Sequence, residues 1–311
     1  MHAADVLTAA MARARSIACI GLDPRPALIP PALRAAALAE HGDTRAAVAS
    51  AFLAFNRGLI DATAAHVAAY KPQLACYEAY GSQGLACLEA TVAYARARGV
   101  PVVADGKRND IGSTAEHYAQ AFLGQAGGLG GTPLPGLEAD WLTVNGYLGS
   151  DGITPFLGSK PGHGIFVLVK TSNPSSGELQ DRLLSGSTTG DQGGPVAEGM
   201  ARLVAKWGQG RVGACGLNDV GAVVGATYPA QARRLRELMP ETVFLVPGYG
   251  AQGGSAGDAL AGRRPDGSGV LVNSSRAILG AWQGTADGAA QWQEAALAAV
   301  LAMNRDLAAA H

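Results

Sequence analysis

The chain has 311 residues, of which 48% are hydrophobic and 16% charged, and its formal net charge is −1. This length fits one large α/β barrel, and the apolar content is enough for a substantial core. The near-zero net charge excludes the broad positive field by which proteins bind nucleic acid or acidic membranes, and leaves room only for a local basic pocket.

Short apolar runs alternate along the chain with longer amphipathic ones. We expect strands at 16–22, 67–71, 102–105, 141–145, 165–171, 222–227, 243–246 and 270–273. We expect helices at 44–66, 84–98, 113–122, 195–207 and 229–238, and helical sequence after the last strand. Eight strands in βα alternation favour a parallel (β/α)8 TIM barrel formed by one domain, 1–311. An open doubly wound sheet is the competing architecture.

Two local features refine this outline. Ser113 to Glu116 spell a capping box at the start of the 113–122 helix. The stretch 172–194 is rich in Ser, Gly, Thr and Asp and joins the fifth strand to the next helix. A loop of this length is often a lid or binding loop, and a surface insertion is the alternative.

Cysteine and histidine usage gives no sign of a metal or redox centre. The four cysteines form no C-x-x-C pair, and the six histidines show no H-E-x-x-H spacing. Arg13 and Arg15 interrupt the apolar N-terminal stretch, which therefore resembles neither a signal peptide nor a membrane span. We expect a cytoplasmic protein with no metal.

Charged residues gather where the expected strands end, which in a barrel is the end that carries the active site. They are Asp23, Lys71, Asp105, Lys107 and Lys170. Asp105 and Lys107 are two residues apart and point the same way in extended geometry. A carboxylate beside an ammonium suits a reaction that builds negative charge on carbon and then needs a proton. Charges leaving the core in a surface salt bridge are the alternative.

A glycine-rich segment, 248–254, follows the seventh strand and formally matches the dinucleotide pattern G-x-G-x-x-G. That site needs a helix directly afterwards and an acid at the end of the next strand. Here Pro265 interrupts the following stretch and the next strand ends in Asn273-Ser274-Ser275-Arg276. A barrel phosphate site with Arg276 as a forked donor fits better, and turn glycines beside a solvated Arg276 are the alternative.

Asp105-x-Lys107-x-x-Asp110-Ile111-Gly112-Ser113-Thr114 forms a D-x-K-x-x-D-I-G-x-T motif, which resembles the signature of the orotidine 5'-phosphate decarboxylase family. The other matching segments are 21–24, 70–72, 170–174, 247–254 and 273–276. The residues that flank these motifs, and the length of the chain, resemble the longer bacterial branch of the family, type 2.

The resemblance implies a homodimeric (β/α)8 lyase that converts orotidine 5'-monophosphate (OMP) to uridine 5'-monophosphate (UMP) and CO2, in pyrimidine biosynthesis, without a cofactor. Lys107 would give a proton to C6, Asp105 would face the departing carboxylate, and Lys71 would hold Asp105 and the ribose. The remaining implied roles are partner-site contacts from Asp110 and Thr114, ribose binding by Asp23, pyrimidine reading by Ser172, and phosphate binding by Gln252, Gly253 and Arg276.

Three rival functions remain open from the sequence. Magnesium-dependent relatives share the D-x-K-x-x-D core, so their activity would be lost in EDTA. A non-catalytic barrel would bind UMP without turnover. A nicotinamide oxidoreductase, suggested by the glycine pattern, would bind its cofactor in a titration.

Overall fold

The structure, a computed structural model, describes residues 2–158, 162–186, 193–250, 253–284 and 288–310. Its main sheet contains eight strands, in the order β2-β1-β12-β11-β10-β7-β6-β3, and every neighbouring pair is parallel. Parallel bridges from Tyr70 to Val102 and from Gln73 to Asp105 join β2 to β3. The sheet therefore closes on itself as the expected (β/α)8 barrel.

The eight barrel strands lie where the apolar runs predict them. They are β1 (Ala18–Leu22), β2 (Ala69–Pro72), β3 (Val103–Arg108), β6 (Trp141–Val144), β7 (Gly164–Lys170), β10 (Val220–Val224), β11 (Phe244–Val246) and β12 (Val270–Ser274). Most of their residues are buried, since helices cover the outside and side chains fill the inside. Trp141 and Phe166 stack with ring centroids 4.6 Å apart, so the barrel interior is a packed core.

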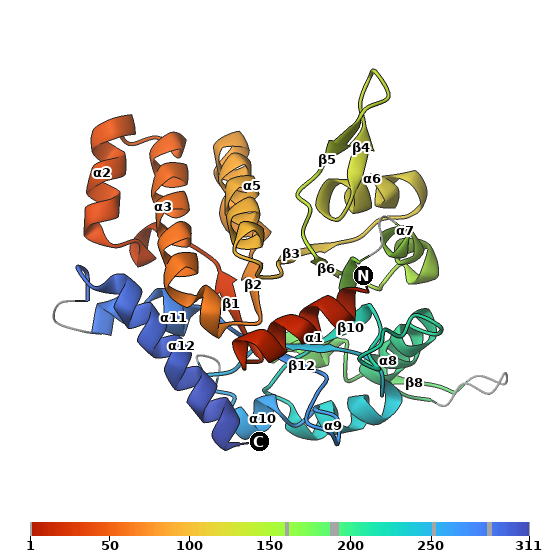
Figure 1. The fold of residues 1–311 in the computed structure, drawn as a ribbon. Coiled ribbons are helices and arrows are strands. Elements are labelled where there is room, and N and C mark those ends of the chain that lie inside the picture. The colour runs from red at the N-terminus through yellow and green to blue at the C-terminus, as the bar shows by residue number, and fades with distance from the viewer. Residues whose placement is uncertain (1, 159–161, 187–192, 251–252, 285–287, 311) are drawn as a thin grey trace.

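Helices surround the barrel in Figure 1. The helices that the sequence predicts are α3 (Arg45–Thr63), α5 (Gly81–Ala97), α6 (Gly112–Phe122), α8 (Val196–Trp207), α9 (Pro229–Leu238) and, after the last strand, α11 (Arg276–Leu279) and α12 (Trp292–Ala309). The sequence outline omits α1 (Ala3–Ala14), α2 (Pro31–His41), α4 (Leu74–Glu78), α7 (Thr154–Leu157) and α10 (Ala256–Ala259). Most of these are short, and α1 and α2 precede the βα pattern or interrupt it.

The expected capping box at α6 is wrong. The helix begins at Gly112, its N-cap is Ile111, and no side chain caps it. The prediction fails because Gly112, with φ 53°, lets the chain turn into the helix two residues earlier than an N-cap at Ser113 implies.

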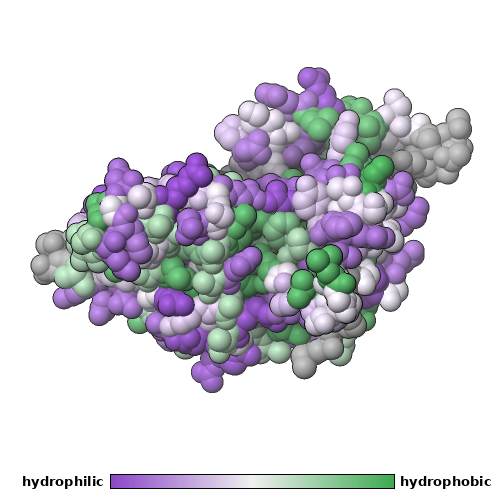
Figure 2. Space-filling view, turned by 90° about the horizontal axis from the view of Figure 1, so that it is seen from above, coloured by the Kyte–Doolittle hydropathy of each residue, from purple (hydrophilic) through white to green (hydrophobic). Residues whose placement is uncertain are grey.

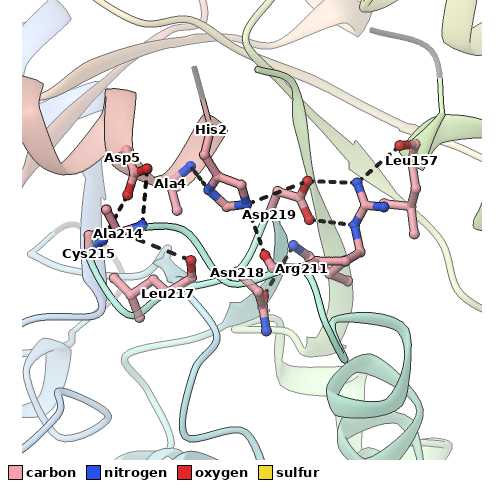
Figure 3. A network of polar contacts seen from close by, with 11 residues as sticks. His2, Ala4, Asp5, Leu157, Arg211, Ala214, Cys215, Leu217, Asn218 and Asp219 are labelled. Atoms are coloured by element: carbon pink, nitrogen blue, oxygen red, sulfur yellow. Dashed lines mark hydrogen bonds and ion pairs between the residues drawn. The ribbon is translucent and has the colours of Figure 1, made fainter. Parts of the chain in front are cut away.

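The N-terminal helix α1 closes the barrel at the amino ends of its strands. Ala3, Ala4 and Leu7 pack in one cluster with residues of the strands, among them Trp141 and Phe166. Figure 3 shows the polar contacts beside this cluster: Asp5 accepts hydrogen bonds from the backbone of Ala214 and Cys215, at 3.1 and 2.8 Å. This end of the barrel is therefore sealed by both apolar packing and hydrogen bonds.

Two short antiparallel strand pairs lie outside the barrel sheet, and Figure 1 shows the first of them, β4 (Gln125–Gly127) and β5 (Pro133–Pro135), extending beyond α6. This pair follows α6 in the chain, and β8 (Leu183–Leu184) pairs with β9 (Gly194–Pro195). The 3-10 helix Pro174–Glu178 and β8 lie within the segment 172–194, and β9 begins at its last residue. The described part of this segment therefore has secondary structure, although its composition suggests an irregular loop.

Candidate active site

A cavity of about 760 Å³ opens at the carboxyl ends of the barrel strands. Its lining comes from residues that directly follow or end different strands, because parallel strands deliver their carboxyl ends to one rim. The predicted site residues that line it are Asp23, Lys71, Asp105, Lys107, Ser172 and Arg276. The structure thus brings together groups that lie up to 253 positions apart (276 − 23) in the sequence.

Asp105 is the centre of a charge cluster on one wall of this cavity. Lys71 Nζ lies 2.6 Å from Asp105 Oδ2, and Lys107 Nζ lies 2.6 Å from Oδ1. The Lys71 side chain is 6% exposed and that of Lys107 is 45% exposed. One ammonium is therefore enclosed in the protein, whereas the other remains open to a ligand in the cavity.

The charges in this cluster stabilise one another. Burial alone raises the pKa of the Asp105 carboxyl, but the ammonium groups of Lys71 and Lys107 outweigh it and hold that pKa well below its usual range. Burial likewise lowers the pKa of Lys71, and the carboxylates of Asp105 and Asp23 reverse this and raise it above its ordinary value. Asp105 is therefore ionised and Lys71 protonated at neutral pH.

The backbone that carries Asp105 and Lys107 is irregular. The pairing of β3 with β6 shifts from Ala104–Leu142 to Arg108–Val144, which marks a bulge. Lys107 has φ 49°, a left-handed conformation that costs a non-glycine residue about 1–3 kcal/mol. The predicted contact between the side chains of Asp105 and Lys107 is confirmed. It arises in a bulge and not in the regular extended strand that the two-residue spacing suggests.

Polar side chains at the ends of β1 and β12 leave acceptors available. Asp23 Oδ2 accepts a hydrogen bond from Ser275 Oγ at 2.7 Å, while no donor among the described residues reaches Asp23 Oδ1. Asn273 Oδ1 is also without a donor within this part of the chain. Both residues line the cavity. Unpaired buried acceptors are costly, so a ligand that supplies hydroxyl donors would be favoured here.

Ser172 lies at the cavity beside a small amide network. The Gln180 side chain accepts from Thr171 N at 2.9 Å and donates to Thr171 Oγ1 at 2.8 Å. Lys170, which directly precedes Thr171, is fully buried, and its Nζ lies 2.8 Å from Asp181 Oδ1. Lys170 is therefore not among the residues that line the cavity, and its charge holds the segment after β7 in place.

The expected phosphate end is described in part. Arg276 begins α11 and lines the cavity, and no described side chain or carbonyl accepts a hydrogen bond from its guanidinium. Gly248 and Tyr249 also line it, and Gly248 has φ 98°, which favours glycine. Gly253 does not line the cavity, and Gln252 lies outside the described residues. The helix that follows, α10, has four residues, unlike the long helix of a dinucleotide site.

Asp110 and Thr114 lie apart from the cavity lining. Asp110 Oδ1 accepts from Ile111 N at 2.8 Å, and Thr114 is exposed near the start of α6. In the single chain these two signature residues therefore do not join the Lys71–Asp105–Lys107 cluster.

Several cavity residues are absent from the sequence-based site. Gln73 Nε2 donates to Asp105 Oδ2 at 3.2 Å, and Thr143 Oγ1 donates to Asp105 Oδ1 at 2.9 Å. Gln180, Asn273 and Ser275 also line the cavity. A hydroxyl at position 143 within the otherwise apolar run Trp141–Val144 is a signal that could have indicated Thr143. Gln180 has no such signal, since only the fold brings it to Thr171.

No group of three or more His, Cys, Asp or Glu side chains is placed to hold a metal ion in the part of the chain that the structure describes. Among the same residues, no helix is both long and apolar enough to cross a membrane.

The fold and site define a (β/α)8 barrel with a Lys–Asp–Lys cluster at the catalytic end. Comparison with known proteins gives the family. The family model described as "Orotidine 5'-phosphate decarboxylase / HUMPS family" matches residues 19–290, and the chain belongs to this family. It is 42% identical to orotidine 5'-phosphate decarboxylase of Rhodopirellula baltica over 313 aligned positions, which cover 99% of each chain.

Further relatives agree with this assignment. The chain is 41% identical to orotidine 5'-phosphate decarboxylase of Haloarcula marismortui over 279 positions, 90% of this chain and 87% of the relative. Its structure matches that of Leishmania donovani OMP decarboxylase with a TM-score of 0.69 at 33% identity, covering 97% of this chain and 100% of the other. The family resemblance seen in the motifs and the predicted barrel are therefore confirmed.

Proposed function

We propose that this chain, acting as one barrel domain, decarboxylates OMP to UMP and CO2 in the cytoplasm, as a carboxy-lyase of de novo pyrimidine biosynthesis. The observation that carries the proposal is the Lys71–Asp105–Lys107 cluster on the cavity wall, in a chain 42% identical over its length to an orotidine 5'-phosphate decarboxylase. The proposed chemistry uses protein side chains and the substrate alone, with no metal or organic cofactor.

The chemistry follows from the exposed ammonium of Lys107. The bond between C6 of the pyrimidine and its carboxylate breaks, CO2 leaves, and the electron pair stays on C6 in the ring plane. This localised charge interacts with a nearby ammonium more strongly than the delocalised carboxylate does, so the transition state is stabilised more than the substrate. Lys107 then transfers a proton from Nζ to C6 and is reprotonated from water.

Asp105 and Lys71 prepare this step. The Asp105 carboxylate accepts from both lysines at 2.6 Å, which holds the Lys107 ammonium at the cavity wall before substrate arrives. The substrate carboxylate would sit against Asp105, and its departure would relieve the repulsion between the two anions. Lys71 would keep Asp105 ionised and reach the ribose.

The other end of the substrate would be held by polar groups around the rim. Asp23 Oδ1, which has no donor among the described residues, would accept from a ribose hydroxyl. Ser172 would read the pyrimidine edge. Arg276 would bind the phosphate with two parallel donors, together with Gln252 and Gly253. Binding energy from this remote phosphate can order the site and exclude water.

We further propose a homodimer in which Asp110 and Thr114 serve the partner's site. Figure 2 shows a largely hydrophilic face on which apolar residues gather in patches. Large apolar side chains that are exposed near α6 and after β6 are Ile111, Leu129, Leu134, Tyr147 and Leu148. An interface that covers them would bury apolar surface and bring Asp110 and Thr114 to another chain.

Subunit mixing tests the placement of Asp110. A dimer of one Lys107→Ala chain and one Asp110→Ala chain contains one intact site if Asp110 acts across the interface, and none if it acts in its own chain. Mixing the two inactive variants with subunit exchange should then restore about a quarter of wild-type activity. Activity that stays at the level of the separate variants would contradict the proposal.

The reaction itself is tested by following OMP absorbance in the ultraviolet with purified protein, with and without EDTA. Loss of substrate absorbance that EDTA leaves unchanged supports the proposal. Turnover abolished by EDTA and restored by Mg²⁺ would indicate a metal-dependent relative. UMP binding without turnover would indicate a binding barrel.

A further inference from the structure

Thr143 is placed between the two residues of the D-x-K sequence. It lies on β6, is 1% exposed, and contributes to the cavity lining. Its Oγ1 accepts a hydrogen bond from Lys107 N at 2.9 Å and donates one to Asp105 Oδ1 at 2.9 Å. The directions are determined by chemistry, because an amide can only donate and an ionised carboxylate can only accept.

The first of these bonds acts on the strained backbone. Lys107 lies in the bulge between Ala104 and Arg108, where the regular pairing of β3 with β6 is interrupted. Its φ of 49° is a conformation that lysine seldom adopts without support from its surroundings. The Thr143 hydroxyl gives the Lys107 amide an acceptor in this conformation and so opposes relaxation of the bulge.

The second bond acts on the carboxylate. Asp105 receives four donors: Lys71 Nζ and Gln73 Nε2 on Oδ2, and Lys107 Nζ and Thr143 Oγ1 on Oδ1. Thr143 shares an oxygen with the Lys107 ammonium and restricts rotation of the carboxylate. It therefore determines where that oxygen holds the ammonium.

We infer that Thr143 is a positioning residue for decarboxylation, which aims the Lys107 ammonium at C6 through both its backbone and its counter-ion. The inference rests on the proposed function. Thr143 itself needs no contact with the reacting atoms, and its effect is transmitted by Lys107. A misplacement of a reacting group by about 1 Å can reduce the rate by about 10²-fold.

The test uses Thr143→Val, which keeps the shape of the side chain and removes the hydroxyl, and Thr143→Ser, which keeps the hydroxyl. Thr91→Val is the matched control, because Thr91 is also 1% exposed and its hydroxyl accepts from Asn56 Nδ2 at 3.0 Å, but Thr91 does not line the cavity. Steady-state kcat and KM for OMP, UMP affinity and thermal stability are measured for all four proteins.

We expect kcat to fall by about 10²-fold in Thr143→Val, while KM and UMP affinity change by less than about threefold. Thr143→Ser should return kcat to within about fivefold of the wild type. Thr91→Val should lose stability with unchanged kcat. If Thr143→Val does not fold, Thr143→Cys, whose thiol is a weak donor, should show the same loss of kcat.

A Thr143→Val enzyme with kcat within about threefold of the wild type would overturn the inference, as would a loss that Thr143→Ser does not recover. A loss of activity that Thr91→Val matches would show a general effect of stability and overturn it too. Absence of OMP turnover in the wild-type protein would instead overturn the proposed function, so the two failures are distinguishable.

Discussion

The two ends of the barrel each contain a nearly buried aspartate beside cationic side chains, and they use it differently. Asp105 at the carboxyl end and Asp219 at the amino end have side chains that are 10% and 9% exposed. Asp105 is paired with lysines, one of which is 45% exposed on a cavity wall. Asp219 is paired with Arg211, whose Nε and Nη2 both lie 2.7 Å from its two oxygens.

The choice of cation explains the difference. The guanidinium of Arg211 is a rigid fork that also donates to Leu157 O at 3.0 Å, and His2 Nε2 lies 3.8 Å from Asp219 (Figure 3). Arg236 is a second such case and donates to the backbone carbonyls of Met239, Thr242, Gly262 and Gly269. Such forks fix one geometry, whereas a lysine ammonium is a point charge that can give up a proton. The amino end stabilises the fold, and the carboxyl end keeps charge available for a substrate.

The largest expected effect is that of Lys107→Ala. Removing the ammonium removes both the stabilisation of the C6 carbanion and its proton donor, so kcat should fall by about 10⁴-fold or more. UMP affinity should remain near the wild-type value, since the phosphate contacts are untouched. Steady-state assays and calorimetric titration with UMP measure both, and near-normal turnover would contradict the role of Lys107.

The matching change at the other end is Arg211→Ala. It leaves Asp219 nearly buried without its fork and should lower the free energy of unfolding by about 2–3 kcal/mol. This is less than the roughly 3–5 kcal/mol for breaking a fully buried pair, because Arg211 is 32% exposed. Urea unfolding measures the loss. In the fraction that stays folded, kcat for OMP should be unchanged, and a selective loss of kcat would break the comparison between the two ends.

A smaller effect is expected for Arg276→Ala. It removes a charged donor from the proposed phosphate site, which is worth about 1.5–3 kcal/mol, so KM for OMP should rise roughly 10- to 100-fold. Because the bound phosphate also helps to order the site, kcat should fall as well, but by a smaller factor than the rise in KM. An unchanged KM would show that Arg276 does not bind the phosphate.

The smallest effect is the pH dependence of stability that the Lys71–Asp105 pair contributes near neutrality. The pKa of Asp105 is lowered on folding, so its contribution is full above the unfolded value of about 4 and is lost as pH falls towards the folded pKa. The pKa of Lys71 is raised, so its contribution is full below about 10 and is lost as pH rises towards the folded pKa.

A variant carrying Lys71→Met and Asp105→Leu removes both titrating groups and serves as the reference. The difference in unfolding free energy between wild type and this variant should be flat from about pH 5 to about pH 9, and should shift against the wild type below about pH 4. Urea unfolding over this range measures it. A steep slope near pH 7 would show that one of the two groups titrates there in the folded protein.

Much of the fold could be predicted from the chain alone. The eight apolar runs and the helices between them determine a parallel barrel, because buried parallel strands need continuous apolar sequence and helical connections. The closure of the barrel by α1 could not be predicted, since no pattern in this Ala-rich N-terminal segment indicates that it packs against the amino ends of the strands. The missed Gly112 start of α6 shows that a local capping signal yields when the backbone turns earlier.

The sequence by itself determined which chemistry is present. The motif around Asp105 and Lys107 carries the family resemblance, and the residues that end each strand are brought to one rim by any parallel barrel. The sequence leaves open the choice between a surface salt bridge and a catalytic cluster, because the burial of Lys71 and the opening of the cavity depend on all eight strands.

Only the tertiary structure decided how the charges are held. Lys107 has a left-handed backbone within the bulge in β3. Two hydrogen bonds of Thr143 reach across from the neighbouring strand β6 to Lys107 and Asp105, which lie 36 and 38 positions earlier in the sequence. Local propensity favours none of them: a left-handed lysine is unfavourable in isolation, and it persists because surrounding contacts compensate for it. The motif thus indicates which charged groups are present, whereas the packing of the barrel determines how the Asp105 oxygens contact the nitrogens of Lys71 and Lys107.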